Sequence, residues 1–192
     1  MSIKATHSLS AMSKEQIISC LIEVFRRYGY EGTTLVRLSQ ATGLNKASLY
    51  YHFPKGKEEM AEAALDQIDR WLETEILVLL RQSETPLRRL RLMSKSVEQF
   101  FKEGKTACLW AVFALGDGDD LFHARIHRAL TLWIEALAHV ITESGIGTVQ
   151  SREKAEDAIL QIQGALMLAR SLKNTEPFQR VLKRLPEELL NS

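Results

Sequence analysis

Apolar residues recur at spacings of three and four along almost the whole chain, which is the period of an amphipathic helix. Proline and glycine are scarce, with 4 and 10 residues among 192. No segment shows the alternation of apolar and polar residues that is typical of a strand. The pattern predicts an all-α protein whose helices span residues 13–29, 35–42, 46–53, 57–81, 86–104, 107–115, 121–144, 151–172 and 175–185.

The second and third expected helices are short and closely joined. Thr34 and Asn45 can cap the second and third helices, and Gly43 permits a tight turn between them. Two short helices joined in this way, with a supporting helix on each side, are typical of a helix-turn-helix DNA-binding module. We therefore expect a DNA-binding domain in residues 1–56 and an all-helical domain for effector binding and dimerisation in residues 57–192.

The third helix would enter the major groove of DNA. Leu49 and Phe53 are four residues apart and can pack inward beside Leu38. The remaining side chains of the helix would point outward, and they include hydrogen-bonding, aromatic and basic groups. These outward-facing residues are Lys46, Ala47, Ser48, Tyr50, Tyr51 and His52.

The stretch GYEGTTLVRLSQATGLNKASLYYHFPKGKEEM, residues 29–60, resembles the signature of the tetracycline-repressor (TetR) family of bacterial transcription regulators. The resemblance implies that Thr34 and residues 50–52 contact the DNA backbone, that residues 46–50 contact bases, and that Lys57 binds a phosphate. The full set expected to bind DNA is Thr34, Arg37, Asn45, Lys46, Ala47, Ser48, Tyr50, Tyr51, His52 and Lys57.

Two features leave parts of this assignment open. An extra residue between Phe53 and Lys57, compared with the commonest pattern of the family, leaves undecided which lysine touches phosphate. Arg37 and His52 can equally be ordinary surface residues.

The distribution of charge supports a DNA partner. Residues 1–57 hold eight Lys or Arg and three acidic residues, a net charge of +5. Residues 58–192 hold seventeen Lys or Arg and twenty-one acidic residues, a net charge of −4. The basic excess therefore lies in the expected DNA-binding module. Moving the boundary to residue 63 lowers the first value to +2, so the asymmetry supports DNA binding without proving it.

Two later helices are expected to form a homodimer. The helix 121–144 is apolar on nearly all sides in its second half, so it must be buried on two faces. The helix 151–172 carries a stripe of mostly small residues, which allows close approach of a second helix. We expect the two helices to pair with their copies in a four-helix interface. The expected interface residues are Leu132, Trp133, Ala158, Ile162, Ala165 and Ala169.

Aromatic residues between the two regions suggest a cavity for a small-molecule effector of unknown identity. The candidate lining residues are Trp71, Phe101, Cys108, Trp110 and Phe113. Aromatic residues at helical spacing also fill ordinary cores, so both interpretations stay open. Cys108 is likewise either a small core residue or a sensor of oxidants and electrophiles. An effector that changed the separation of the two DNA-binding modules in the dimer would release DNA, as expected of a repressor.

Other kinds of chemistry find little support. His123 and His127 are four residues apart near Asp119 and Asp120, which is a metal-ligand spacing, but no third compelling ligand follows. We therefore expect no metal, and no cofactor. The chain has no nucleophile elbow, phosphate-binding loop or dinucleotide fingerprint, so we do not expect an enzyme. The sequence leaves open a DNA-binding protein without an effector, the operator sequence, and whether transcription is repressed or activated.

The location of the protein follows from its cysteines and its hydropathy. Cys20 and Cys108 each lie in apolar helical sequence rather than at disulfide spacing, which favours a reducing compartment. Residues 1–12 lack the apolar core of a signal peptide, and no apolar run approaches the roughly 20 residues that cross a bilayer. We expect a cytoplasmic protein with no membrane partner.

Overall fold

The computed structural model of the chain describes residues 12–191, apart from the side chains of Asp117 and Asp119. Every regular element in this part of the chain is a helix, so the predicted all-α fold is confirmed. None of these helices combines the length and the apolarity that a membrane span requires. Residues 1–11, most of the segment that argued against a signal peptide, lie outside the described residues.

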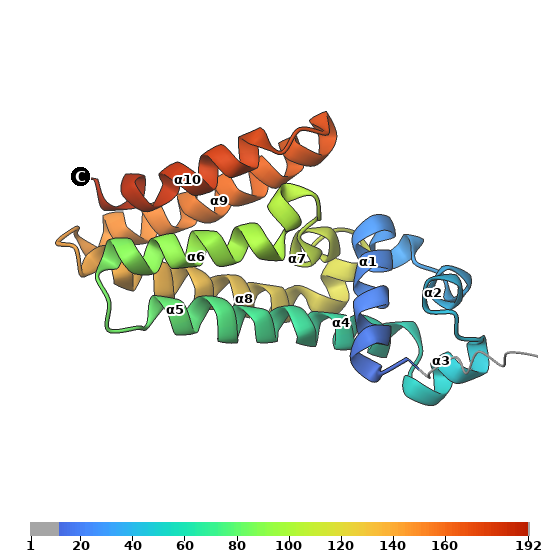
Figure 1. Ribbon diagram of the computed structural model, residues 1–192. Coiled ribbons are helices and arrows are strands. Elements are labelled where there is room, and N and C mark those ends of the chain that lie inside the picture. The colour runs from blue at the N-terminus through green and yellow to red at the C-terminus, as the bar shows by residue number, and fades with distance from the viewer. Residues whose placement is uncertain (1–11, 192) are drawn as a thin grey trace, which may run out of the picture.

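The helices form a small N-terminal module at one end of a longer bundle (Figure 1). The module consists of α1 (Lys14–Gly32), α2 (Leu35–Thr42) and α3 (Lys46–His52). One continuous helix then leads away from the module through α4 (Lys57–Trp71), the π-helical segment η1 (Leu72–Leu77) and α5 (Val78–Leu80). The rest of the bundle is made of α6 (Pro86–Phe100), the 3₁₀ turn η2 (Lys102–Gly104), α7 (Leu109–Phe113), α8 (Asp117–Thr142), α9 (Thr148–Leu172) and α10 (Glu176–Leu190).

The first helix begins where its capping residues predict. The backbone N–H of Gln16 donates to Ser13 Oγ at 3.2 Å, and the Ser13 N–H donates to Gln16 Oε1 at 2.8 Å. The apolar face of α1, with Ile17, Leu21 and Phe25 fully buried, packs against α2, α4 and α7. The first helix thereby forms the core of the N-terminal module.

Several predicted boundaries were wrong, among them those of α8, α9 and α10. The break expected over residues 116–120 is confined to Gly116, and α8 begins at Asp117. Helix α9 begins at Thr148, and Ser151, the expected cap, is buried and donates from Oγ to the carbonyl of Ile146 at 3.3 Å. Helix α10 continues through Pro186 to Leu190, because Leu185 and Leu189 are buried on the face that packs against α6 and α9.

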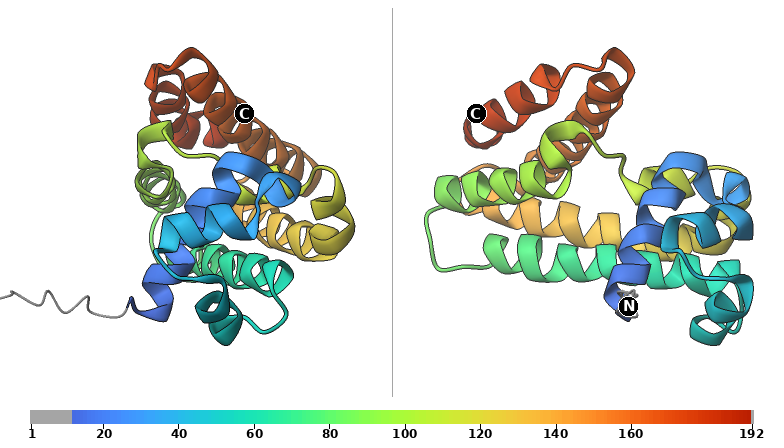
Figure 2. Two further views of the ribbon diagram at one scale, coloured as in Figure 1. Left: turned by 90° about the vertical axis from the view of Figure 1, so that its right-hand side faces the viewer. Right: turned by 45° about the vertical axis from the view of Figure 1, so that its right-hand side comes forward.

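An aromatic cluster joins the N-terminal module to the bundle. The ring of Phe25 meets Phe113 edge-on with centroids 5.2 Å apart, and the ring of Tyr30 meets Phe122 edge-on at 5.4 Å. Phe113 and Phe122 are stacked at 5.2 Å. Phe25 and Tyr30 of α1 are both buried in this contact. The module therefore packs against α7 and α8, in addition to being connected to the bundle through the chain (Figure 2).

Candidate nucleic-acid interface

The turn between α2 and α3 is built as a helix-turn-helix requires. Gly43 ends α2 in the left-handed conformation, with φ of 68°, which glycine adopts without strain. Thr34 Oγ1 accepts the N–H of Arg37 at 3.3 Å, and Asn45 Oδ1 accepts the N–H of Ser48 at 2.8 Å. Both expected caps are thus confirmed, and these short polar side chains fix the starts of the two helices.

Helix α3 is anchored from its inner side. Leu49 and Phe53 are buried together with Leu38 of α2. The opposite side of α3 faces solvent: Lys46, Ala47, Tyr50 and Tyr51 are exposed, and Ser48 and His52 are half-buried. Tyr51 is 83% exposed. The structure therefore brings the predicted base-contacting side chains onto one accessible face.

The position of Tyr50 depends on the loop that follows α3. Gly56 has φ of 73°, and a Cβ added there would lie 3.2 Å from Tyr50 Cε1. Within α3, the Nζ atom of Lys46 lies 5.9 Å from the centroid of the Tyr50 ring. The absence of a side chain at Gly56 lets the Tyr50 ring lie close to the loop, beside the exposed face of α3.

Arg37 is held in place by the end of α1. Its guanidinium lies 4.1 Å from the centroid of the Tyr28 ring, and Nη1 donates to the carbonyl of Gly32. A ring face and a cation attract each other through the ring quadrupole, so the two side chains orient one another. Sequence reasoning missed Tyr28, because its contact with Arg37 joins two helices across the loop at residues 33–34.

Lys57 is placed differently from the phosphate-binding role expected of it. Its Nζ atom donates to the carbonyl of Tyr30 at 3.0 Å and lies 4.1 Å from the centroid of the Tyr30 ring. The residue is half-buried between α1 and α4, whereas Lys55 in the preceding loop is exposed. The structure thus gives Lys57 a partner within the chain and leaves Lys55 accessible to a phosphate.

Three of the predicted effector residues, Trp71, Phe101 and Trp110, form a closely packed cluster. Trp71 stacks on Phe100 with centroids 3.8 Å apart and meets Phe101 and Trp133 edge-on at 6.1 and 5.8 Å. Trp110 donates from Nε1 to Asp69 Oδ1 at 3.1 Å. The larger surface clefts of residues 12–191 have other linings. Phe113 lies apart from this cluster, between Phe25 of α1 and Phe122 of α8.

The expected dimer residues mostly face inward. Trp133, Ala158, Ile162, Ala165 and Ala169 are buried within a single chain, and only Leu132 is partly exposed. Side chains buried within one chain are not accessible to a second copy, so the structure does not offer these five residues for the expected interface. The stripe of small residues on α9 allows close packing within the chain, since α9 lies between α8 and α10.

The opposite face of α9 carries a second apolar stripe. Its exposed side chains are Leu160, Met167, Leu168 and Leu172, and Gly164 lies among them. These residues recur at spacings of three and four, so the sequence did contain the signal. Helix α9 is apolar on two sides, and its sequence alone did not show which side is covered within the chain.

The remaining candidates have no assembled site around them. Burial raises the pKa of the Cys108 thiol, because the anionic thiolate is less stable away from water. The rings of His123 and His127 lie 6.2 Å apart. Among the described residues, no three His, Cys, Asp or Glu side chains come together as metal ligands. The side chain of Asp119, which was part of the candidate metal site, lies outside what the structure describes.

Comparison with known proteins agrees with this geometry. Residues 17–64 match the model of "Bacterial regulatory proteins, tetR family", and residues 86–184 match that of "Transcriptional regulator LmrA/YxaF-like, C-terminal domain". The transcriptional regulator LmrA of Bacillus subtilis is 26% identical over 182 residues, covering 92% of this chain and 96% of LmrA.

Solved structures show the same fold. A TetR transcriptional regulator from Legionella pneumophila superposes with a TM-score of 0.78 and 18% identity, covering 92% of this chain and 97% of its own. A TetR-family regulator from Agrobacterium tumefaciens superposes with a TM-score of 0.75 and 22% identity, covering 90% of this chain and 94% of its own.

Proposed function

The chain belongs to the TetR family of transcriptional regulators, and from this premise we propose that it is a repressor that binds a palindromic operator as a homodimer and leaves it when a small-molecule effector binds. The exposed face of α3 is the observation that carries this proposal. Residues 1–56 act as the DNA-binding domain and residues 57–192 as the effector and dimerisation domain. Such a regulator works on chromosomal DNA, in the cytoplasm.

Sequence recognition is assigned to α3. Lys46 and Tyr51 are exposed on a helix whose opposite side is anchored by Leu49 and Phe53, so their side chains can reach into a major groove without disturbing the module. Thr34, Asn45 and Lys55 lie at helix starts or in the adjoining loop, where they are available to phosphates. Arg37, Ala47, Ser48, Tyr50 and His52 complete the proposed contact surface.

Dimerisation is assigned to the exposed stripe of α9, supported by the half-buried Leu132 of α8. The stripe is built of Leu160, Met167, Leu168 and Leu172, and it is contiguous along the last four turns of the helix. Exposed apolar side chains are stabilised when another apolar surface covers them. In a dimer with a two-fold axis, the same stripe of the second copy supplies that surface. A dimer presents two copies of α3 to half-sites about 34 to 36 Å apart.

The effector is assigned to the aromatic cluster around Trp71. Trp133 Nε1 is buried there with no hydrogen-bond partner among the described residues, so a planar ligand with an acceptor oxygen would satisfy it. Trp71 is half-buried at the end of α4 and directly precedes the π-helical segment η1, a kind of irregularity that is common at functional sites. Displacement of Trp71 would shift α4, whose other end adjoins α3.

Selection of bound sequences from random DNA tests the proposal. We expect a palindrome, and we expect Lys46→Ala to relax preference at particular positions by about 1–3 kcal/mol per lost bidentate base contact. Lys183→Ala is a matched control, because Lys183 is exposed on α10 at a distance from α3. An unchanged preference for Lys46→Ala and Tyr51→Ala together would contradict the assignment of α3.

A further inference from the structure

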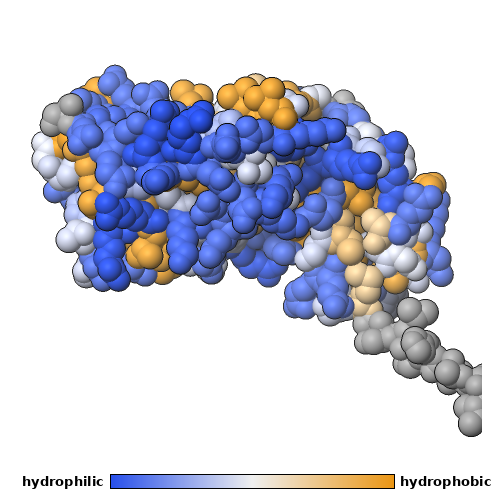
Figure 3. Space-filling model, turned by 45° about the horizontal axis from the view of Figure 1, so that its top comes forward, coloured by the Kyte–Doolittle hydropathy of each residue, from blue (hydrophilic) through white to orange (hydrophobic). Residues whose placement is uncertain are grey.

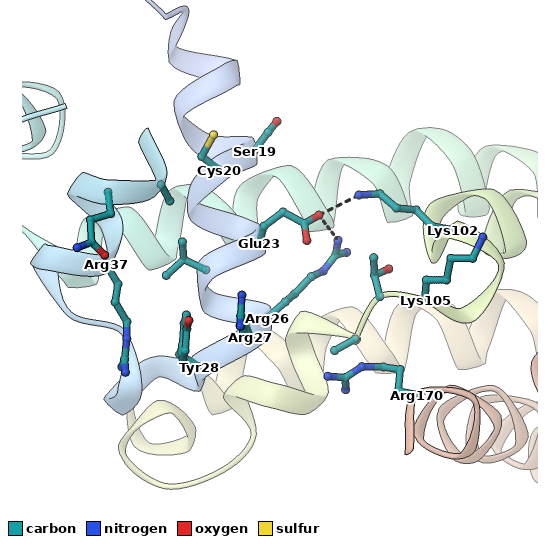
Figure 4. Close-up of a pocket in the computed structure, with 15 residues that line it drawn as sticks. Ser19, Cys20, Glu23, Arg26, Arg27, Tyr28, Arg37, Lys102, Lys105 and Arg170 are labelled. Atoms are coloured by element: carbon teal, nitrogen blue, oxygen red, sulfur yellow. Dashed lines mark hydrogen bonds and ion pairs between the residues drawn. The ribbon is translucent and has the colours of Figure 1, made fainter. Parts of the chain in front are cut away.

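A basic cleft of about 800 Å³ lies between the N-terminal module and the bundle (Figure 4). One wall is formed by α1 and α2, and the other by residues 102–107 and the end of α9. The cationic residues that line the cleft are Arg26, Arg27, Arg37, Lys102, Lys105 and Arg170, and the only carboxylate in its lining is that of Glu23. The lining therefore carries a net charge of +5.

The positive charge is only partly compensated. Glu23 Oε1 lies 3.1 Å from Lys102 Nζ and 3.7 Å from Arg26 Nη1, so one carboxylate serves two cations. Lys105 is paired with Glu103. Among the described residues, no carboxylate forms a recorded ion pair with Arg27 or Arg170. Figure 4 shows Arg26 reaching from α1 toward Lys102, and Arg170 extending from α9 toward α1.

Arg26 is the strongest indication that this cleft binds an anion. Its side chain is only 8% exposed, and Nε and Nη2 have no hydrogen-bond partner among the described residues. Burial also lowers the pKa of Arg26, because a charged guanidinium loses its hydration. Thr106 Oγ1, in the same lining, is likewise buried and unpartnered. Buried groups of this kind are costly unless an anion completes their hydrogen bonds.

We propose that this cleft binds a small metabolite carrying two or more phosphate groups. The planar fork of a guanidinium matches two oxygens of one phosphate, and several cations in one concave site favour a multiply charged anion. The volume accommodates a molecule as large as a nucleotide. Duplex DNA does not fit this geometry, because a rigid double helix cannot reach an arginine buried on the inner wall.

The position of the cleft gives the bound anion a regulatory role, which rests on the proposed function. One wall belongs to the DNA-binding module and the other to the bundle. An anion that bridges Arg27 and Arg170 holds the two parts in one relative orientation, and the spacing of the two copies of α3 depends on that orientation.

Titration calorimetry with inorganic pyrophosphate on the full chain tests the site. We expect one saturable site per chain, and a loss of affinity of about tenfold or more for Arg170→Gln. Arg81→Gln is the matched control, since Arg81 is an exposed arginine at the far end of the bundle and should bind like the unaltered chain. Arg26→Met should abolish binding while the melting temperature stays the same or rises, because an unsatisfied buried charge is removed.

Three results would overturn the proposal. Absence of saturation, or equal weakening by Arg81→Gln, would show only non-specific attraction of anions. Displacement of pyrophosphate by duplex DNA, together with weaker DNA binding by Arg170→Gln, would assign the cleft to the DNA backbone. Operator affinity that is unchanged at saturating pyrophosphate would remove the regulatory role. Failure to bind any operator, both with and without pyrophosphate, would count against the proposed function instead.

Discussion

Lys57 Nζ donates to the backbone carbonyl of Tyr30 at 3.0 Å and thereby ties the start of α4 to the end of α1. The same ammonium lies over the Tyr30 ring at 4.1 Å. Because Tyr30 also packs on Phe122 of α8, this contact lies where the module meets the bundle. A residue expected to bind DNA phosphate therefore has a structural position in the chain.

The first prediction separates Lys55, in the loop before α4, from Lys57, the first residue of that helix. Lys57→Ala should lower the free energy of unfolding by about 1–2 kcal/mol, because a hydrogen bond from a charged group is lost. Lys55→Ala should leave stability unchanged and reduce the slope of log affinity against log salt by about 0.9 for each phosphate contact, or twice that per dimer. Denaturant titration and DNA binding at several salt concentrations measure both effects. A reduced salt slope for Lys57→Ala alone would restore the phosphate role to Lys57.

The second prediction concerns the two faces of α9. Met167→Arg places a charge on the exposed apolar stripe, so it should give a folded monomer whose dimerisation is roughly 10- to 100-fold weaker. Ala165→Arg places the charge inside the chain and should unfold it. Sedimentation together with circular dichroism distinguishes the two outcomes.

An exposed apolar residue away from α9 provides the control for that experiment. Val78 on α5 is about half exposed, so Val78→Arg should change neither folding nor dimerisation. The face seen in Figure 3 is mostly hydrophilic, with an apolar patch along its upper edge. A charge can therefore disturb an apolar contact at some exposed positions and not at others. A dimer that withstands both Met167→Arg and Leu168→Arg would place the interface elsewhere.

The third prediction concerns the reactivity of the two cysteines. Burial raises the pKa of Cys108 and keeps its sulfur from solvent, whereas Cys20 is partly exposed. Only the thiolate attacks electrophiles, so iodoacetamide at neutral pH should label Cys20 well before Cys108 in the folded protein. Peptide mass spectrometry measures both rates, with labelling in denaturant as the control. Faster labelling of Cys108 would support a sensor role.

The fourth prediction concerns acid stability. The buried Arg89 donates a hydrogen bond to the Glu143 carboxylate, and this hydrogen bond holds the pKa of the Glu143 carboxyl below its ordinary value of 4.5. A carboxylate with a lowered pKa in the folded state stabilises the protein above its unfolded-state pKa, and this contribution is lost as the pH falls through the folded-state value. Glu143→Gln should therefore destabilise the chain at pH 7 and make its stability less dependent on pH in the acid range.

Thermal melts from pH 7 down to pH 3 check this dependence. Glu156→Gln is the control, because Glu156 pairs with Arg152 on an exposed helix surface and should contribute little at any pH. Identical acid dependence of Glu143→Gln and the unaltered chain would contradict the role given to the Arg89 pair.

The sequence by itself determined the helix-turn-helix. Its caps at Thr34 and Asn45, its turn at Gly43, and the spacing of Leu49 and Phe53 all act within a few residues of one another. Short-range geometry of this kind is readable from the chain, because each local preference favours the same structure as the final fold. The length of the helix that begins at Lys57 was predictable for the same reason.

Only the tertiary structure decided which surfaces are available. Helix α9 is apolar on two sides, and packing against α8 and α10 determined that Ala165 lies inside and Met167 outside. The partner of Lys57 is 27 residues away, and the basic cleft gathers side chains from four separate segments. Burial and electrostatic pairing depend on distances in space, and residue spacing along a chain constrains those distances only within one helix or turn.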